Sequence, residues 1–148
     1  MNDFKPFEDK LAGLIAALSP ARRRRMTADI AKKLRQRQQQ RIKSQKAPDG
    51  SPFAPRKRQP VRAKKGRIKR EMFVKLRTNC YLKASDNDSS AVVEFTGKVQ
   101  RIARVHQYGL RDKPGYYCNY VKYQKRQLLG EDKFEKDVIN NIVLGYLE

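Results

Sequence analysis

The chain has few of the residues from which metal centres and disulfide frameworks are built. Its 148 residues include one histidine, two cysteines and no tryptophan. Cys80 and Cys118 lie far apart and form no CxxC pair, and together with His106 they would offer an incomplete tetrahedral ligand set. We therefore expect no metal site, and we expect both cysteines to be buried free thiols of a reduced compartment.

Catalytic motifs are missing as well. The sequence has no glycine-rich phosphate loop, no nucleophile elbow and no pair of closely spaced carboxylates. His106 lies in a helix-like segment without a nucleophile or an orienting group nearby, which favours a histidine packed for structural reasons. The sequence predicts no enzyme, no catalytic residues and no cofactor.

Long apolar runs are also absent. No stretch approaches the roughly 18 consecutive apolar residues that a membrane span requires. The N-terminus lacks the basic region, apolar run and cleavage site of a secretory signal. We expect no membrane partner.

Acidic residues are scarce in one segment, between Arg22 and Arg77. This segment holds 22 Lys+Arg and three acids, so it carries +19 of the chain's net charge of +20. Such a segment favours a negative partner, either the phosphates of a nucleic acid or an acidic protein surface in an assembly. Phe53 and Phe73 are the aromatic residues within it, so any nucleic-acid binding would be directed to the backbone and tolerant of sequence. Composition alone supports both partners equally.

The whole chain is long enough for one domain, over residues 1–148. Helical periodicity dominates its first third. An amphipathic helix is predicted over residues 7–18. Ser19 and Pro20 favour the start of a second helix, which we expect to run to about residue 45. Its second half is polar where the apolar stripe would continue, at Arg37, Gln38 and Arg41. We expect this half to project beyond its own subunit or to pack against a neighbour.

A basic arm follows the second helix, over residues 46–67. Proline and glycine predict an irregular loop at residues 46–60, with Phe53 as its apolar anchor. The cations expected to contact a partner or DNA are Arg56, Lys57, Arg58, Arg62, Lys64, Lys65, Arg67, Lys69 and Arg70. Residues 68–76 then predict a short helix that returns to the core.

The second half of the chain predicts a small sheet with helices. Alternating residues over 80–95, with turn chemistry at 86–89, indicate a β-hairpin. A short helix should follow and end at Gly109 in the left-handed conformation. Residues 116–123 predict a third strand, and a last amphipathic helix should follow Asp132. The predicted fold class is α+β: a small antiparallel sheet, made of the hairpin and a further strand, packed with helices, with a long basic N-terminal helix and an extended basic loop.

Several motifs resemble the phage virion morphogenesis family, in the order expected of it. They are SPARRR (19–24), DGSPFAPR (49–56), FVKLR (73–77), FTG (95–97), RIARVHQYGL (101–110) and RQLLG (126–130). The family usually has a Tyr-Pro pair before the last motif, whereas here Tyr123 is followed by Gln124. The resemblance is to the tail completion proteins of temperate phages with contractile tails.

The resemblance implies a structural virion protein formed by a single tail-completion domain. Such a protein would complete the head-proximal end of the tail as a ring, as a tail terminator or a neck component, and would enable head–tail joining. The implied partners are further copies in a hexamer, the tail tube, neck or connector proteins, and phage DNA in the lumen. The implied location is the virion, after assembly in the host cytoplasm.

The resemblance also places a structural junction at Arg104, His106, Gln107, Tyr108 and Gly109. The alternative function that the residues leave open is a sequence-nonspecific nucleic-acid-binding protein.

Overall fold

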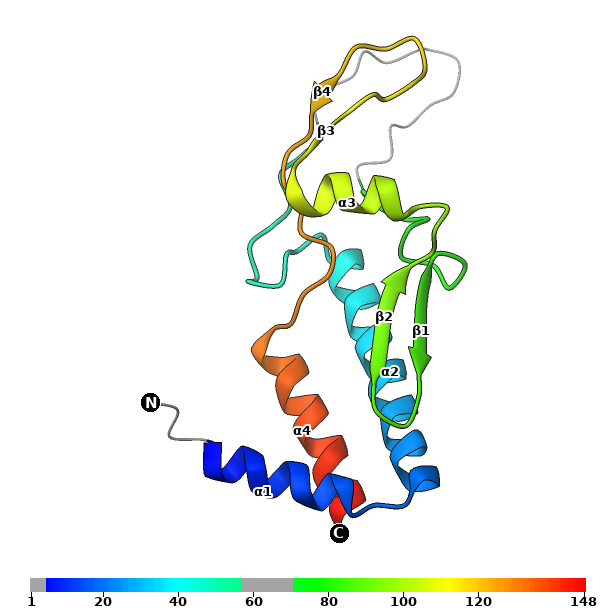
Figure 1. Ribbon diagram of the computed structural model, residues 1–148. Coiled ribbons are helices and arrows are strands. Elements are labelled where there is room, and N and C mark those ends of the chain that lie inside the picture. Colours follow the sequence, from blue (N-terminus) through cyan, green and yellow to red (C-terminus); the bar gives the residue numbers. More distant parts are fainter. Residues whose placement is uncertain (1–4, 57–70) are drawn as a thin grey trace. The chain divides into compact units, whose positions relative to one another are not determined.

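The computed structural model describes residues 5–56 and 71–148 and has an α+β fold (Figure 1). Two antiparallel sheets of two strands each pair β1 with β2 and β3 with β4. The elements in chain order are α1 (Lys5–Ala16), α2 (Pro20–Lys43), β1 (Leu82–Asp86), β2 (Ala91–Phe95), α3 (Gln100–Tyr108), β3 (Arg111–Asp112), β4 (Val121–Lys122) and α4 (Lys133–Leu147). The predicted fold class is confirmed. None of the helices within the described ranges is long and apolar enough to cross a bilayer.

Contacts along the chain define two compact units. The first unit comprises the chain up to residue 35 together with residues 84–93 and 133–148. The second unit comprises residues 36–83 and 94–132. The helix α2 therefore contributes to both units, and each unit is described below by itself.

The first unit is built on the start of α2. The Ser19 side chain accepts a hydrogen bond from the Arg22 backbone amide at 3.2 Å, which confirms the predicted cap before Pro20. Arg22 donates to the Tyr146 carbonyl at 3.0 Å, and its guanidinium lies 5.3 Å from the centre of the Tyr146 ring. The Tyr146 hydroxyl in turn donates to Asp29. These contacts tie the end of α4 to α2, and α4 also contacts α1.

The hairpin of β1 and β2 forms as predicted. Asn87 closes its turn, because the Asn87 side-chain oxygen accepts hydrogen bonds from the amides of Ser89 and Ser90 at 2.8 and 2.7 Å. Turn chemistry read from the sequence therefore located this hairpin correctly.

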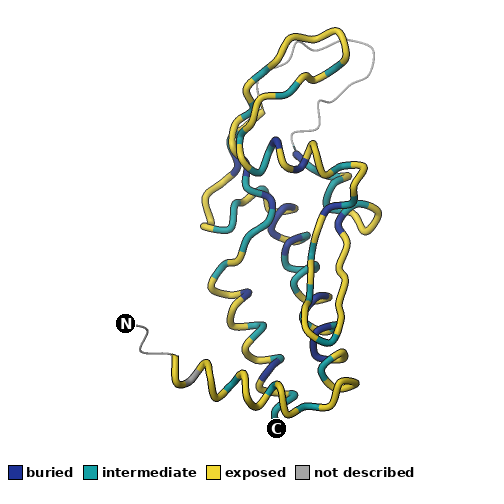
Figure 2. Tube along the Cα trace, viewed as in Figure 1, coloured by how far each residue is buried: buried dark blue, intermediate teal, exposed yellow. Residues whose placement is uncertain are grey.

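The second unit holds most of the buried apolar residues. Fully or nearly fully buried here are Ile42, Phe53, Met72, Leu82, Phe95, Ala103, Val105 and Leu128 (Figure 2). Phe53 anchors the loop after α2, as predicted. α3 ends at Gly109, whose φ of 66° and whose hydrogen bond to the Val105 carbonyl confirm the predicted left-handed cap.

The predicted helix over residues 68–76 is wrong for residues 71–76, which form a bend, two residues without regular structure and a turn that begins at residue 74; residues 68–70 lie outside the described ranges. Phe73 has a φ of 65°, which interrupts a right-handed helix. The Gln45 side chain donates to the Met72 carbonyl and accepts from the Met72 amide, both at 2.9 Å. The backbone groups of Met72 are therefore used by a distant side chain instead of by a helix.

The third predicted strand is confirmed only at β4. Arg111 pairs with Lys122 and Asp112 with Val121, so this strand forms a separate sheet with β3 and does not extend the hairpin. The tyrosines before it are exposed, Tyr116 at 89% and Tyr117 at 96%. Both cysteines are free, but they are exposed, so their predicted burial is wrong.

Of the two alternatives expected for the polar half of α2, projection beyond its own subunit is wrong for Gln38 and Arg41, whereas packing against a neighbouring subunit stays a prediction. Gln38 and Arg41 are buried in the second unit. Gln38 donates to the Gly130 carbonyl at 3.0 Å, and Arg41 donates to the Leu128 carbonyl at 3.0 Å and to the Gly130 carbonyl at 3.2 Å. These polar side chains hold a chain segment that has no regular secondary structure.

Substitution of Gly130 tests how tightly this segment packs. A Cβ at this position would meet Pro48 Cγ at 2.5 Å and the Gln127 side chain at 2.8 Å. We expect Gly130→Ala to lower the free energy of unfolding by about 1–3 kcal/mol, because the ring of Pro48 cannot move aside freely. Urea unfolding of the variant and the parent protein measures this difference in the free energy of unfolding. Gly97→Ala is the control, since a Cβ there meets nothing within 4 Å; equal losses in both variants would contradict the expectation.

Candidate functional site

A row of aromatic rings crosses the second unit and links four of its segments. The ring centres are separated by 5.6 Å for Phe53 and Phe73, by 4.9 Å for Phe73 and His106, and by 5.1 Å for His106 and Tyr123. All pairs are edge to face, and such a pair contributes about 0.5–1.5 kcal/mol beyond its buried area. The row fixes the loop after α2, the turns after residue 70, α3 and the exit of β4 against one another.

His106 lies in the middle of this row and is half-buried. Burial lowers its pKa, and the charges of Arg126 and Arg56 lower it further. Its Nδ1 is buried without a hydrogen-bond partner among the described residues. A neutral imidazole packed between rings is therefore the stable form, in agreement with the predicted structural histidine.

Gln107, the next residue of α3, holds the RQLLG motif. Its side-chain oxygen accepts from the amides of Leu128 and Leu129 at 2.8 and 2.9 Å, and its Nε2 donates to the Leu129 carbonyl at 2.8 Å. Gln38 and Arg41 bind the peptide groups of Leu128 and Gly130, as described above. We call this arrangement, in which the three side chains hold residues 128–130, the glutamine clasp.

Arg126 holds the first part of the basic arm, just before Arg56. Its side chain is buried and donates to the carbonyl oxygens of Ala54 at 2.7 Å and Pro55 at 3.1 Å. Its backbone amide donates to the His106 carbonyl at 2.7 Å. Burial lowers the pKa of the guanidinium, and Arg56 lowers it further. Neutral carbonyls do not neutralise the buried positive charge, so an anion bound nearby would stabilise it.

The structure unites part of the predicted junction. His106 and Gln107 face the core, and Gly109 lies so close to Lys125 that a Cβ would stand 3.0 Å from the Lys125 amide nitrogen. Arg104 and Tyr108 are exposed on α3 instead. Sequence reasoning missed the roles of Gln38 and Arg41, for which the available signal was polar residues at positions that periodicity assigns to an apolar face. It also missed the role of Arg126, for which the signal was its place in the RQLLG motif.

The basic arm enters this region at Arg56, which is exposed. The other predicted contact residues lie outside the described residues: Lys57, Arg58, Arg62, Lys64, Lys65, Arg67, Lys69 and Arg70.

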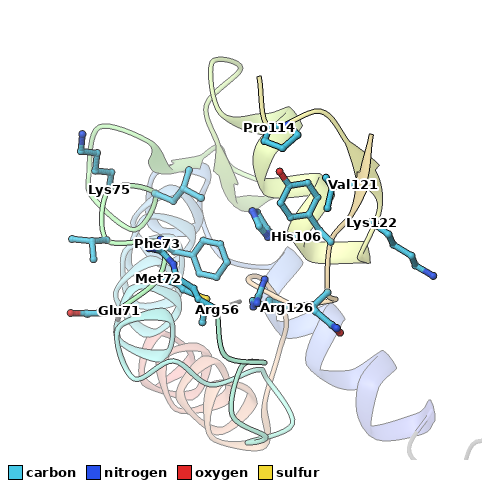
Figure 3. Close-up of a pocket in the computed structure, with 14 residues that line it drawn as sticks. Arg56, Glu71, Met72, Phe73, Lys75, His106, Pro114, Val121, Lys122 and Arg126 are labelled. Carbon is cyan, nitrogen blue, oxygen red and sulfur yellow. The ribbon is translucent and has the colours of Figure 1, made fainter. Parts of the chain in front are cut away.

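A pocket of about 870 Å³ lies beside the aromatic row (Figure 3). Phe73, His106 and Tyr123 line it together with cations and apolar residues of the neighbouring turns. Within the described part of the chain, no group of three or more His, Cys, Asp or Glu residues could hold a metal ion. The chemistry that this arrangement offers is binding of an anionic or amphipathic group.

Comparison with known proteins places the sequence. It matches the phage virion morphogenesis family over residues 2–148. The chain belongs to the phage virion morphogenesis family. Tail completion protein S of Escherichia phage P2 is 48% identical over 149 positions, which cover 100% of this chain and 99% of that protein. No solved structure matches the chain.

Family membership confirms the resemblance that the ordered motifs indicated. The structure explains two of these motifs physically. In RIARVHQYGL the histidine packs in the aromatic row, the glutamine binds the RQLLG backbone, and the glycine ends α3. In RQLLG the arginine binds the first part of the basic arm, at Ala54, and the last three residues occupy the glutamine clasp.

The pH dependence of stability tests the role of His106. Because its pKa is lower in the folded protein, the unfolded chain takes up a proton first as the pH falls below about 6.5. The free energy of unfolding should therefore fall as the pH is lowered through this range, and the loss is complete below the folded pKa.

The variant His106→Phe keeps a ring in the row and removes the titrating group. We expect its free energy of unfolding to decline less than that of the parent protein between about pH 7.5 and 5.5, since it lacks this linkage. Parallel profiles for the two proteins would show that His106 does not contribute.

Proposed function

We propose that this protein is a structural virion protein that completes the head-proximal end of a phage tail as a ring and enables head–tail joining. The observation that carries the proposal is 48% identity, over the full length of both chains, to a protein named for tail completion. The ring acts as a tail terminator or a neck component.

The proposed ring is a hexamer that contacts the tail tube and neck or connector proteins. A closed ring requires each copy to present one surface to a second, different surface of its neighbour. The chain carries unusually exposed aromatic and apolar side chains that suit such contacts: Tyr108, Tyr116, Tyr117, Tyr120, Phe134 and Leu144. Exposed tyrosine is characteristic of protein interfaces because its ring packs while its hydroxyl stays hydrated.

The basic arm is the proposed electrostatic contact of this ring. Residues 56–70 carry nine Lys or Arg and no acid. An acidic surface of a partner ring neutralises this charge best, and DNA passing through the lumen is its second partner. The location that follows is the virion, after assembly in the host cytoplasm.

A sequence-nonspecific nucleic-acid-binding protein is the second candidate function. The net charge of +20 favours it. So does the exposed Tyr120 ring, which lies 4.9 Å from the Lys113 ammonium and could stack on a base beside a phosphate-binding cation.

Inactivation of the gene in its phage separates the two functions. We expect filled heads and tails that fail to join, because the tail end is left incomplete, and electron microscopy of the lysate shows this. Mass spectrometry of purified wild-type particles should detect the protein. Joined particles without the gene, together with its absence from virions and tight salt-sensitive DNA binding by a monomer or dimer, would favour the second function.

A further inference from the structure

Apolar and cationic side chains together line the pocket beside the aromatic row. We call the lining residues Met72, Phe73, Val74 and Leu76 its apolar wall, and Val121 and Tyr123 also line the pocket. Met72 and Phe73 lie on one side of it and Val121 on the other (Figure 3). All of these residues belong to the second unit. A volume of about 870 Å³ is at the upper end of the range for ligand sites, so it accommodates several side chains of a peptide.

The charge of the pocket is strongly positive. Its cations are Arg56, Lys75, Lys122 and Arg126. Its acid is Glu71, which already forms an ion pair with Arg77. Lys75 and Lys122 are exposed, and neither takes part in an ion pair within the described residues. The pocket therefore offers cations to an incoming anion and little acidic charge of its own.

Arg126 gives the pocket a cation that is already desolvated. Its side chain is 7% exposed, and its hydrogen-bond acceptors are the neutral carbonyls of Ala54 and Pro55. Buried charges in proteins are normally paired, because desolvation is costly unless an opposite charge compensates it. A carboxylate delivered to the pocket would supply that compensation.

The apolar wall is held in a strained conformation before anything binds. Phe73 has a φ of 65°, which is rare for a bulky residue. The residue before it, Met72, is held by the side chain of Gln45, which hydrogen-bonds both the carbonyl and the amide of Met72. Gln45 also has a positive φ, of 59°. Phe53 supports the Phe73 ring from behind at 5.6 Å. Strain of this kind persists where the surroundings enforce it and is concentrated at binding sites.

We propose that this pocket binds an acidic peptide segment of a partner protein. An aspartate or glutamate of the segment pairs with Lys122 and Arg126, and a neighbouring apolar side chain packs against Phe73 and Tyr123. The identity of the partner as another virion protein rests on the proposed function; the chemistry of the pocket does not. A nucleic-acid backbone fits less well, because it has no apolar group to pack against Met72, Phe73 and the other apolar lining residues.

A displayed library of random 12-residue peptides, selected on the whole protein at about 0.15 M salt, tests the proposal. We expect the selected peptides to combine Asp or Glu with an aromatic or aliphatic residue. Their affinity, measured by fluorescence anisotropy, should fall about tenfold for the double variant Lys75→Gln, Lys122→Gln, since the carboxylate loses Lys122 as a partner and the pocket loses Lys75 as a second exposed cation. Phe73→Gly, which suits the positive φ and removes the ring, should weaken binding as well.

The matched control is the double variant Lys83→Gln, Lys98→Gln, which removes the same charge from exposed positions of the same unit outside this pocket. Equal affinity of the two double variants, or selected peptides without acidic residues, would overturn the proposal. The proposal would also be overturned if the Lys75→Gln, Lys122→Gln variant lost affinity tenfold for a 20-base-pair DNA duplex but kept its affinity for the selected peptides. Absence of the protein from virions would refute the proposed function. Peptide binding that depends on the pocket would still support the pocket assignment in that case. Urea unfolding confirms that each variant is folded.

Discussion

Side-chain recognition of a bare peptide segment is the interaction on which the second unit depends. Residues 128–130 belong to no helix or strand, so their backbone groups need other partners. Gln107 supplies them from α3, and Gln38 and Arg41 supply them from α2. Leu128 is thereby kept fully buried. An unsatisfied buried amide or carbonyl costs about 1–3 kcal/mol, so a break in this clasp would expose the core to several such penalties.

The glutamine clasp also sets the chemistry of the surface. By fixing the RQLLG segment it places Arg126 against Ala54 and Pro55 of the basic arm and beside His106. The rings of Phe73 and Tyr123 then close on His106 from two sides. Lys75 and Lys122 form no ion pair within the described residues, so these exposed cations of a rigid scaffold are suited to contact an anionic partner.

The sequence correctly predicted those features that depend only on residues close together in the chain. The Ser19 cap, the Asn87 turn and the left-handed Gly109 each depend on neighbours a few positions away, and each is confirmed. The clasp could not be predicted in this way, because Gln38 and Gly130 are 92 positions apart and a polar residue on α2 reads as a solvated one. The predicted helix around Phe73 was wrong for the same reason, because the distant side chain of Gln45 bonds the Met72 carbonyl that a helix would use. Family resemblance supplied the junction but not the bonds within it.

Amide hydrogen exchange at Leu128 and Leu129 tests the importance of the clasp most directly, because both amides donate to the Gln107 side chain. We expect both to be protected in the parent protein, and we expect Gln107→Leu to accelerate their exchange by roughly tenfold or more, with the unfolding free energy lowered by about 1–3 kcal/mol. Gln100→Leu, an exposed position of the same helix, should change neither. Unchanged protection of Leu128 and Leu129 in Gln107→Leu would show that another interaction holds the segment.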